Sequence, residues 1–331
     1  MKPPLFWQNP PDAPGLMARI LSPLSMVWRA TSDRRWRRGA HADAGVPVIC
    51  VGNINMGGTG KTPTVIWLVE RLRDFGVDPH IVSRGYGGSE AGPLEVTPKM
   101  PVSKVGDEPL LLCAFARTWV AKDRLAGVRA AKAAGAGVVV LDDGMQNPSV
   151  AKAMTIMVVD AGQGFGNGRL VPAGPLRQSV SEGLARADAA LVLGEAKEHA
   201  RFAKTWPQVK TAASFRGRVG PLQTGMDWSD LRVFAFAGIG RPAKFFDTLR
   251  GLGANVAVER AFADHQPLSD ALMARMDNEA AQIHAQLVTT EKDAARLPEA
   301  WRGQVLTLPV RLEVEDEQGL LEMVETALST Q

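Results

Sequence analysis

The sequence predicts a doubly wound α/β fold, in which mainly parallel strands lie between two layers of helices. The first indication is a series of apolar runs of four or five residues, separated by patterns of helical spacing. Short runs without polar alternation are typical of parallel strands buried on both faces. The second is the length of 331 residues, which corresponds to about two domains. The third is residues 216–230, rich in glycine and polar side chains, which we expect to form a domain boundary or linker.

The predicted strands and helices alternate along the chain, as this architecture requires. Before the expected linker, we predict strands at 48–51, 80–82, 137–141, 156–159 and 190–193, and helices at 62–75 and over most of 110–133. After it, we predict strands at 233–236, 256–258, 287–289 and 305–308, and helices at 242–252, 269–285 and from about residue 316.

The composition is that of a folded globular chain. Hydrophobic residues make up 45% and charged residues 22%, and no run approaches the ~20 apolar residues of a membrane-spanning helix. The two cysteines, Cys50 and Cys113, are too few for a disulfide framework or a four-cysteine zinc site. The N-terminus lacks the pattern of a secretory signal. We therefore expect a reducing compartment.

The basic character of the chain is concentrated in residues 1–40. Seven basic and two acidic residues there give +5, so the other 291 residues of this chain of net charge +3 sum to −2. Apolar side chains recur at helical spacing over 16–30, with Pro23 interrupting the pattern, and four arginines lie within 34–38. One interpretation is an interfacial helix on an anionic membrane. The other is an ordinary helix packed on the core.

A glycine-rich loop directly follows the first predicted strand. It runs from Gly52 to Gly60, and Lys61 and Thr62 begin the next predicted helix. In such a loop successive backbone N–H groups point at phosphate oxygens, the lysine reaches the β- and γ-phosphates, and the threonine hydroxyl binds Mg²⁺. The sequence therefore predicts a P-loop nucleotide site. Its expected residues are Asn55, Met56, Gly57, Gly58, Thr59, Gly60, Lys61 and Thr62.

Two features complete this predicted phosphate site. Asn55 stands where the usual P-loop pattern has glycine, and we expect the following glycines to compensate. Asp142 and Asp143 follow the apolar strand 137–141, so we expect them at the carboxyl edge of the sheet, where open α/β folds bind ligands. We expect Thr62 and one of these acids to hold Mg²⁺, and one acid to cap the turn that follows.

Several short motifs together resemble those of the tetraacyldisaccharide 4′-kinases of lipid A biosynthesis. They occur in the family's order over about residues 46–312, and the set is far more specific than any one member. Besides the P-loop, they are Ser83 to Gly87, Gly106 to Pro109, Leu141 to Gln146, Pro172 to Arg177, Phe236 to Pro242, Phe262 to His265 and Thr289 to Asp293.

The resemblance implies a P-loop NTPase-like α/β/α kinase domain at residues 41–225 and a smaller α/β/α domain at 226–331 that closes over the active site. It implies transfer of the γ-phosphoryl group of ATP to the 4′-hydroxyl of an acylated glucosamine disaccharide 1-phosphate, a lipid A precursor. Because that substrate sits in a bilayer, the resemblance favours residues 1–40 as a membrane-associating segment, at the cytoplasmic face of the inner membrane. We expect no nucleic-acid partner.

The resemblance also implies roles for single residues. Asp107 matches the general base that takes the proton of the sugar hydroxyl, and His265 matches the histidine that orients it. Arg177 matches an arginine that contacts phosphate, beside the catalytic Lys61. Tyr86, the only tyrosine, follows Arg84 and is expected to pack on the nucleotide base or line the cleft, or else to be a plain loop aromatic.

Other positions of the motifs are left without a catalytic role. Asn147 and Gln178 stand where the family commonly has histidine and glutamate, so we expect neither to transfer a proton or bind a metal. The role of Lys292 and Asp293 is open, and the alternative for Asp293 is a helix cap.

Two other functions fit the P-loop alone. One is a soluble kinase or GTPase that acts on a small metabolite or a protein partner, and it leaves the basic amphipathic start unexplained. The other is a nucleotide-gated binding protein without chemistry, which has no need of Asp107 and His265. The chain has no Asn-Lys-x-Asp motif that reads guanine, which favours ATP.

Overall fold

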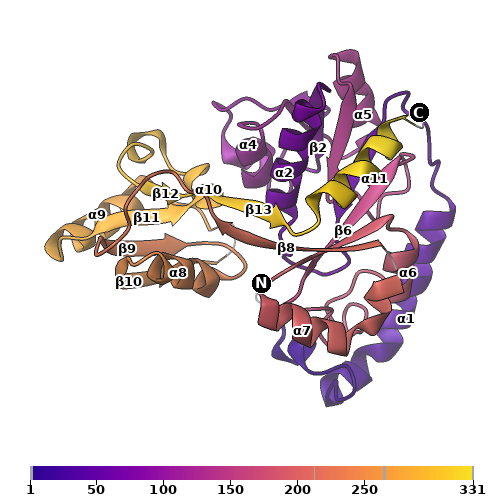
Figure 1. Ribbon diagram of the computed structural model, residues 1–331, viewed down its shortest axis with the longest axis horizontal. Coiled ribbons are helices and arrows are strands. Elements are labelled where there is room, and N and C mark those ends of the chain that lie inside the picture. The colour runs from indigo at the N-terminus through magenta and orange to yellow at the C-terminus, as the bar shows by residue number, and fades with distance from the viewer. Residues whose placement is uncertain (1–2, 212, 264–265, 330–331) are drawn as a thin grey trace.

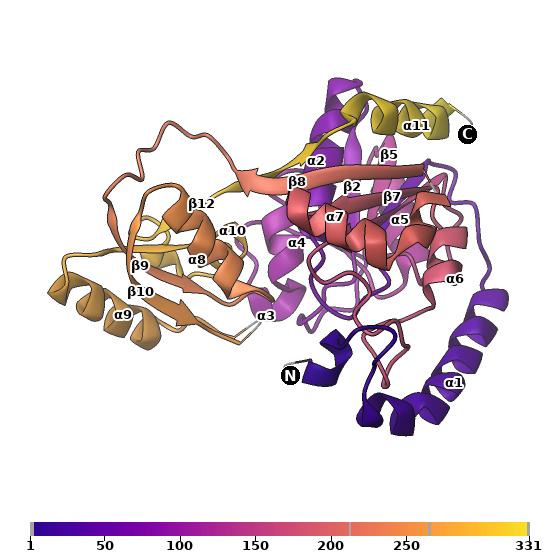
Figure 2. The ribbon, with the colours of Figure 1, turned by 60° about the horizontal axis from the view of Figure 1, so that its bottom comes forward.

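The computed structural model describes residues 3–211, 213–263 and 266–329. Within these residues the strands form two sheets, one of nine strands and one of four. Figures 1 and 2 show two units side by side, the larger on the right and the smaller on the left. Helices cover both faces of each sheet, which confirms the predicted α/β class.

The larger sheet is mainly parallel. Its strands are β1 (Val48–Gly52), β2 (Pro79–Ser83), β3 (Leu94–Glu95), β4 (Thr118–Val120), β5 (Val138–Asp142), β6 (Met154–Asp160), β7 (Ala189–Leu193), β8 (Ala213–Pro221) and β13 (Val310–Val314). They lie in the order β13-β8-β7-β6-β1-β5-β2-β4-β3. β1 pairs in parallel with β5 and β6, and the register of Val51 with Asp142 places the end of β5 beside the start of the glycine-rich loop.

Two helical layers bury the faces of the larger sheet. On one face lie α2 (Lys61–Asp74), α4 (Asp107–Leu112) and α11 (Glu317–Ser329), which contribute Leu72, Leu112 and Leu320 to one apolar cluster. On the other lie α5 (Arg124–Ala133), α6 (Val180–Ala185) and α7 (Ala196–Thr205), which contribute Val128 and Phe202 among others to a second cluster. Short turns of helix are η1 (Leu5–Gln8), α3 (Val102–Val105) and η2 (Pro207–Thr211).

The smaller unit repeats this architecture on a reduced scale. Its elements are β9 (Arg232–Ala237), α8 (Pro242–Gly251), β10 (Asn255–Ala261), α9 (Asp270–Gln282), β11 (Gln286–Thr290), α10 (Glu291–Ala294), η3 (Glu299–Trp301) and β12 (Leu306–Leu308). The strands are parallel in the order β10-β9-β11-β12. Phe245 and Phe246 of α8 fill one face, and Met273 and Met276 of α9 fill the other.

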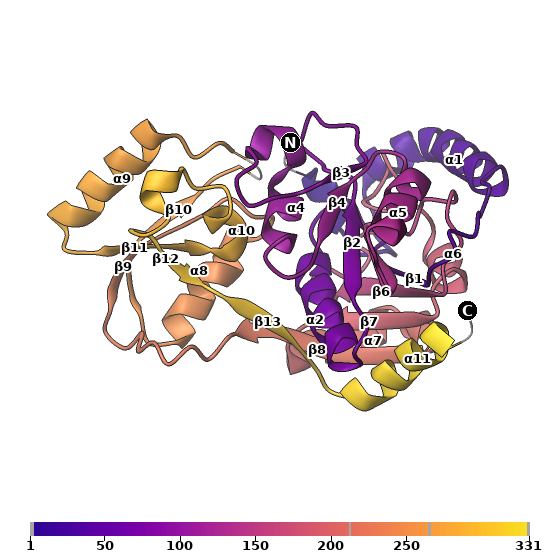
Figure 3. The ribbon, with the colours of Figure 1, turned by 90° about the horizontal axis from the view of Figure 1, so that it is seen from above.

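The C-terminal segment returns to the larger unit. β13 pairs antiparallel with β8, and Figure 3 shows it running from the smaller unit toward α11. Leu312, Leu320 and Val324 are buried in the same cluster as α2. Residues 310–329 therefore lie with the larger sheet and not with the smaller domain, to which the predicted boundary of 226–331 assigned them.

Two further regions differ from the sequence prediction. The helical stretch expected over 110–133 is interrupted by β4, because Thr118 to Val120 pair with β2 and Asp123 caps a new helix, α5. The expected linker at 216–230 begins inside β8, whose Gly217 packs closely on β13. A Cβ at Gly217 would lie 2.7 Å from the carbonyl oxygen of Glu313, so this glycine serves strand packing.

α1 (Leu16–Arg37) continues through Pro23. Figure 2 shows this helix along the outside of the larger unit. It buries the small residues Ala18 and Ser25. Its apolar side chains that are more than half exposed are Leu16, Met17, Ile20, Leu24, Met26 and Val27. Most of the apolar stripe is therefore outside the core, against the core-packing interpretation. In the described part of the chain, no helix combines the length and apolar character needed to cross a bilayer.

Leu320→Ala is expected to lower the free energy of unfolding by about 2–5 kcal/mol, because it removes a fully buried side chain of α11 from the core of the larger unit. Urea unfolding followed by circular dichroism measures the change. Glu325→Ala, at an exposed position of the same helix, is the control and should cost less than about 0.5 kcal/mol. Equal effects of the two substitutions would contradict the packing of α11.

Candidate active site

The glycine-rich loop joins the end of β1 to the start of α2, as predicted. Gly60 is the N-cap of α2 and has a φ of 95°, in the left-handed region that favours glycine. A Cβ at Gly60 would lie 2.4 Å from Leu193 Cδ1. By contrast, a Cβ at Gly57 or Gly58 would meet nothing within 4 Å. The loop is therefore fixed at its helical end and open where phosphates are expected.

Two asparagines hold the loop in shape. The Asn53 side-chain amide donates to the Gly57 carbonyl at 3.2 Å and to Thr59 Oγ1 at 3.0 Å. Asn55, at the position that usually holds glycine, is buried and donates to the carbonyl of Gly164 at 2.9 Å. Its side chain therefore anchors the loop to a neighbouring segment.

A second segment, residues 169–177, lies against the glycine-rich loop, and we term it the bracing loop. The Met56 N–H donates to the Pro175 carbonyl at 2.7 Å. The Arg177 N–H donates to the Ile54 carbonyl, also at 2.7 Å. Backbone hydrogen bonds thus align the two segments side by side and place Arg177 next to the phosphate site.

The two adjacent acids have different partners. Asp142 ends β5, and its Oδ2 accepts a hydrogen bond from Ser83 Oγ at 2.9 Å. Asp143 follows with a φ of 54°. Arg177 Nη1 lies 2.9 Å from each of its carboxylate oxygens, and Lys61 Nζ lies 3.8 Å from Oδ1. The structure thus brings together four of the residues predicted for the site.

These surroundings move the pKa values of the two acids in opposite directions. Burial, together with the charges of Glu108 and Asp143, raises the pKa of Asp142 to about 7. Burial also acts against ionisation of Asp143, but Lys61 and Arg177 outweigh it and lower the pKa of this carboxyl. Lys61 and Arg177 therefore stabilise the charged form of Asp143, whereas Asp142 lacks enough positive charge nearby to offset its burial.

Asp107 is presented to this region by α4 and is 2% exposed. Its Oδ1 accepts the N–H of Glu108 at 3.0 Å. Lys292 of α10, in the smaller unit, places its Nζ 3.7 Å from Asp107 Oδ2 and 3.3 Å from Glu108 Oε1. The predicted base therefore lies at a contact between the two units. Its predicted partner, His265, lies outside the described residues.

The remaining predicted residues lie at the rim of this arrangement. Thr62 is the second residue of α2 and is partly buried. Tyr86 follows β2 and is 69% exposed, so its ring lies on the surface. Met56, at the tip of the glycine-rich loop, is 42% exposed.

Two contributors were not predicted as site residues. Gln146 donates from Nε2 to the Asn53 carbonyl at 2.7 Å and accepts from Arg177 Nη1 at 3.2 Å, and its place in the Leu141 to Gln146 motif was the available signal. Arg124 is 4% exposed, and burial lowers the pKa of its guanidinium although Asp142 opposes this. No sequence signal marks it, because an arginine in the first turn of a helix is usually solvated.

The positions left without a catalytic role have structural partners. Asn147 accepts hydrogen bonds from the backbone and the hydroxyl of Ser149. Gln178 accepts one from Arg186. Asp293 is fully buried and bonds within the smaller unit, where Thr290 and not Asp293 is the N-cap of α10.

A glycine-rich loop at the end of a central parallel strand, with a lysine opposite an acid pair, defines a P-loop nucleotide-binding protein. The family model for tetraacyldisaccharide-1-P 4′-kinase matches residues 17–329. The chain belongs to this family, which confirms the resemblance found in the motifs.

Relatives and solved structures agree with this membership. The tetraacyldisaccharide 4′-kinase of Dinoroseobacter shibae is 54% identical, over 98% of this chain and 97% of the relative. That of Rhodospirillum centenum is 48% identical, over 99% of this chain and 97% of the relative. A crystal structure of LpxK from Aquifex aeolicus in complex with ATP is similar with a TM-score of 0.75 and 25% identity, covering 95% of this chain and 100% of that chain.

Asp142→Asn is expected to raise the free energy of unfolding at about pH 8, by at most about 4 kcal/mol. A carboxyl whose pKa is raised in the folded state destabilises the fold as pH rises from its ordinary 3.8 to about 7, because the unfolded state loses its proton first. The amide removes this penalty and keeps an acceptor for Ser83. Chemical unfolding at about pH 5 and about pH 8 measures the difference.

The matched control is Asp143→Asn. Because Lys61 and Arg177 lower the pKa of Asp143, its charge contributes stability above its ordinary pKa, and its loss should destabilise the protein at about pH 8. If Asp142→Asn destabilised the protein to the same extent, the assigned difference between the two acids would be wrong.

Proposed function

We propose that this chain transfers the γ-phosphoryl group of ATP to the 4′-hydroxyl of tetraacyldisaccharide 1-phosphate and so forms lipid IVA, a step of lipid A biosynthesis. The observation that carries the proposal is the phosphate loop with Lys61 opposite Asp143, and Asp107 lies at a contact between the two units. Family membership supplies the acceptor. The similar LpxK structure in complex with ATP supports the donor.

Backbone and side-chain groups of this protein account for the steps of phosphoryl transfer. The backbone N–H groups of the glycine-rich loop and Lys61 bind the β- and γ-phosphates, and Arg177 contacts the transferred group. Asp107 accepts the proton of the 4′-hydroxyl while that oxygen forms its bond to the γ-phosphorus. The bond from this phosphorus to the β–γ bridging oxygen breaks, and ADP leaves with the electron pair.

The acid pair and Thr62 fit Mg²⁺, which prefers oxygen ligands and is usually bound by one or two carboxylates with substrate phosphates. Burial and the charges of Glu108 and Asp143 disfavour the charged form of Asp142, and a bound cation would favour it. We assign Thr62 and Asp142 as ligands, because Asp143 is already paired with Lys61 and Arg177. When bound, Mg²⁺ neutralises charge on the transferring phosphates.

The metal site would depend mainly on the nucleotide. Among the described residues, no three His, Cys, Asp or Glu side chains gather into a metal-binding group. Phosphate oxygens and water would therefore supply the other ligands. His265 is retained in this proposal as the partner of Asp107, and Tyr86 as a residue near the nucleotide base.

We also propose that α1 holds the protein on the anionic cytoplasmic face of the inner membrane. Leu24 and Val27 belong to the exposed apolar side chains of this helix, and the arginines at 34, 35, 37 and 38, at and just beyond its C-terminal end, are also exposed. Apolar contact with acyl chains and arginine contact with lipid phosphates act together in such helices.

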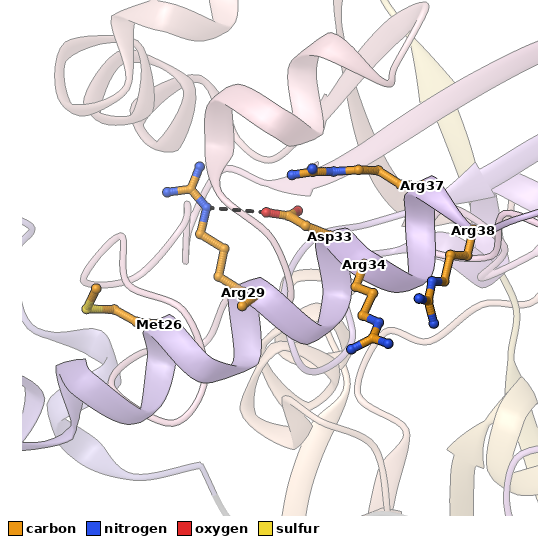
Figure 4. A pocket seen from close by; sticks show the side chains of 7 residues that line it. Met26, Arg29, Asp33, Arg34, Arg37 and Arg38 are labelled. Atoms are coloured by element: carbon orange, nitrogen blue, oxygen red, sulfur yellow. Dashed lines mark ion pairs between the residues drawn. The ribbon is translucent and has the colours of Figure 1, made fainter.

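A pocket of about 510 Å³ on α1 adds to this basic surface. Figure 4 shows Arg34, Arg37 and Arg38 beside Arg29 and Asp33, whose side chains form an ion pair of 3.8 Å. Arg29 also forms an ion pair with Glu182 at 2.7 Å, so Arg34, Arg37 and Arg38 are the groups that we propose to contact the phosphate of an anionic lipid headgroup.

We propose that three parts of the chain have separate roles. Residues 1–40 contact the membrane, residues 41–225 with 310–329 form the kinase domain, and the segment from 226 to 309 closes over the active site. A soluble kinase, a GTPase or a binding protein without chemistry is not favoured, because the family and the exposed apolar side of α1 both point to a lipid acceptor.

Lys61→Ala is expected to lower the transfer rate at least about a hundredfold, because it removes a charge from the phosphates. Asp107→Asn should lower kcat about 10²–10⁴-fold and change KM for ATP much less. Purified protein, Mg²⁺, radiolabelled ATP and tetraacyldisaccharide 1-phosphate in detergent micelles measure both.

Asp247→Asn, at a position whose side chain is 73% exposed in the smaller unit, is the matched control and should retain full activity. Label in the lipid at the wild-type rate with Asp107→Asn would remove Asp107 from the mechanism. If the wild-type protein hydrolysed ATP without labelling the lipid, the proposed acceptor would be wrong.

The double substitution Leu24→Asp with Val27→Asp is expected to lower binding to vesicles rich in anionic phospholipid at least about tenfold, because it places charge on the exposed apolar side of α1. Sedimentation with the vesicles measures it. Leu222→Asp, at an apolar position outside α1 that is 41% exposed, is the control. Unchanged sedimentation of the α1 variant would refute the membrane role of this helix.

A further inference from the structure

α1 is hydrogen-bonded to the bracing loop through its buried side. Ser25 Oγ donates to the Leu170 carbonyl at 2.8 Å and accepts from the Ala173 N–H at 3.2 Å. Three residues further along the helix, the indole N–H of Trp28 donates to the carbonyl oxygen of Arg177 at 2.9 Å. The helix that carries the exposed apolar side chains therefore reaches the backbone of a proposed phosphate-binding residue.

Arg177 is held from two sides by its own peptide groups. Its N–H bonds to Ile54 in the glycine-rich loop, and its carbonyl bonds to Trp28 in α1. Its guanidinium then donates to Asp143 and Gln146. The two backbone bonds fix the position from which the side chain extends, and loss of one of them loosens that position.

We infer that Trp28 is a positioning residue for phosphoryl transfer, which holds Arg177 in place and links the outer face of α1 to the nucleotide site. Trp28 is 39% exposed and lies next to the exposed Val27, so a surface that covers α1 also restrains the indole. Trp28 touches neither acid of the site in any described contact and acts through Arg177. The inference rests on the proposed function, since it takes Arg177 as the group that contacts phosphate.

Trp28→Phe tests this inference, because it keeps an aromatic ring and removes the N–H donor. We expect kcat for lipid phosphorylation to fall about fivefold to tenfold, with less than about a twofold change in KM for ATP. Vesicle binding should be unchanged. Trp36→Phe is the matched control on the same helix, since the ring of Trp36 packs near Arg186 and Lys152, and it should retain wild-type kcat.

A double-mutant comparison separates positioning from a general structural role. In an Arg177→Ala background, Trp28→Phe should lower kcat by less than about twofold more, because the group that it positions is gone. An equal fall in both backgrounds, or wild-type kcat for Trp28→Phe alone, would overturn the inference. Should Trp28→Phe fail to fold, Ser25→Ala removes the neighbouring bonds to the bracing loop and is compared in the same two backgrounds.

The activity of the wild-type protein distinguishes failure of the inference about Trp28 from failure of the proposed function. If it does not label the lipid, the proposed acceptor is wrong, and the same variants are then compared by their rates of Mg²⁺-dependent ATP hydrolysis. If Trp28→Phe lowers the rate of ATP hydrolysis in the wild-type background but not in the Arg177→Ala background, the inference is supported in that assay also. Equal losses in both backgrounds overturn it.

Discussion

The carboxylate of Asp143 lies between Lys61 and Arg177, and the rest of the site is arranged around this charge cluster. This partly buried carboxylate is accompanied by two cations, which offset the cost of removing it from water. The three residues come from α2, the end of β5 and the bracing loop. They meet because β5 is the immediate neighbour of β1, so the strand order of the larger sheet determines the geometry of the phosphate site.

The parts predicted well from sequence are those that depend on local pattern. The run 138–141 identifies a strand because it is apolar throughout. Asp142 and Asp143 are placed by the end of that strand and Lys61 by the start of α2. β4 was missed because three residues between two helices carry too weak a signal. β13 was missed because its partner, β8, is nearly a hundred residues away in the chain, and local pattern carries no information on such pairing.

Side-chain contacts between distant segments could not be predicted from the sequence for the same reason. Lys292 belongs to a recognised motif, but only the packing of α10 against α4 brings it to Asp107. Arg241 of the smaller unit likewise forms an ion pair with Asp160 at the end of β6. The smaller unit therefore forms charged contacts with the larger one both at α4 and at the end of β6.

The return of β13 and α11 to the larger unit also bears on the order in which the protein is completed on the ribosome. The smaller unit is synthesised before the last strand and helix of the larger one. Until residues 310–329 emerge, part of the apolar face of α2 lacks the cover that Leu320 and Val324 later supply. Until then, the core of the larger unit is incomplete beside α2, the helix that begins with Lys61 and Thr62.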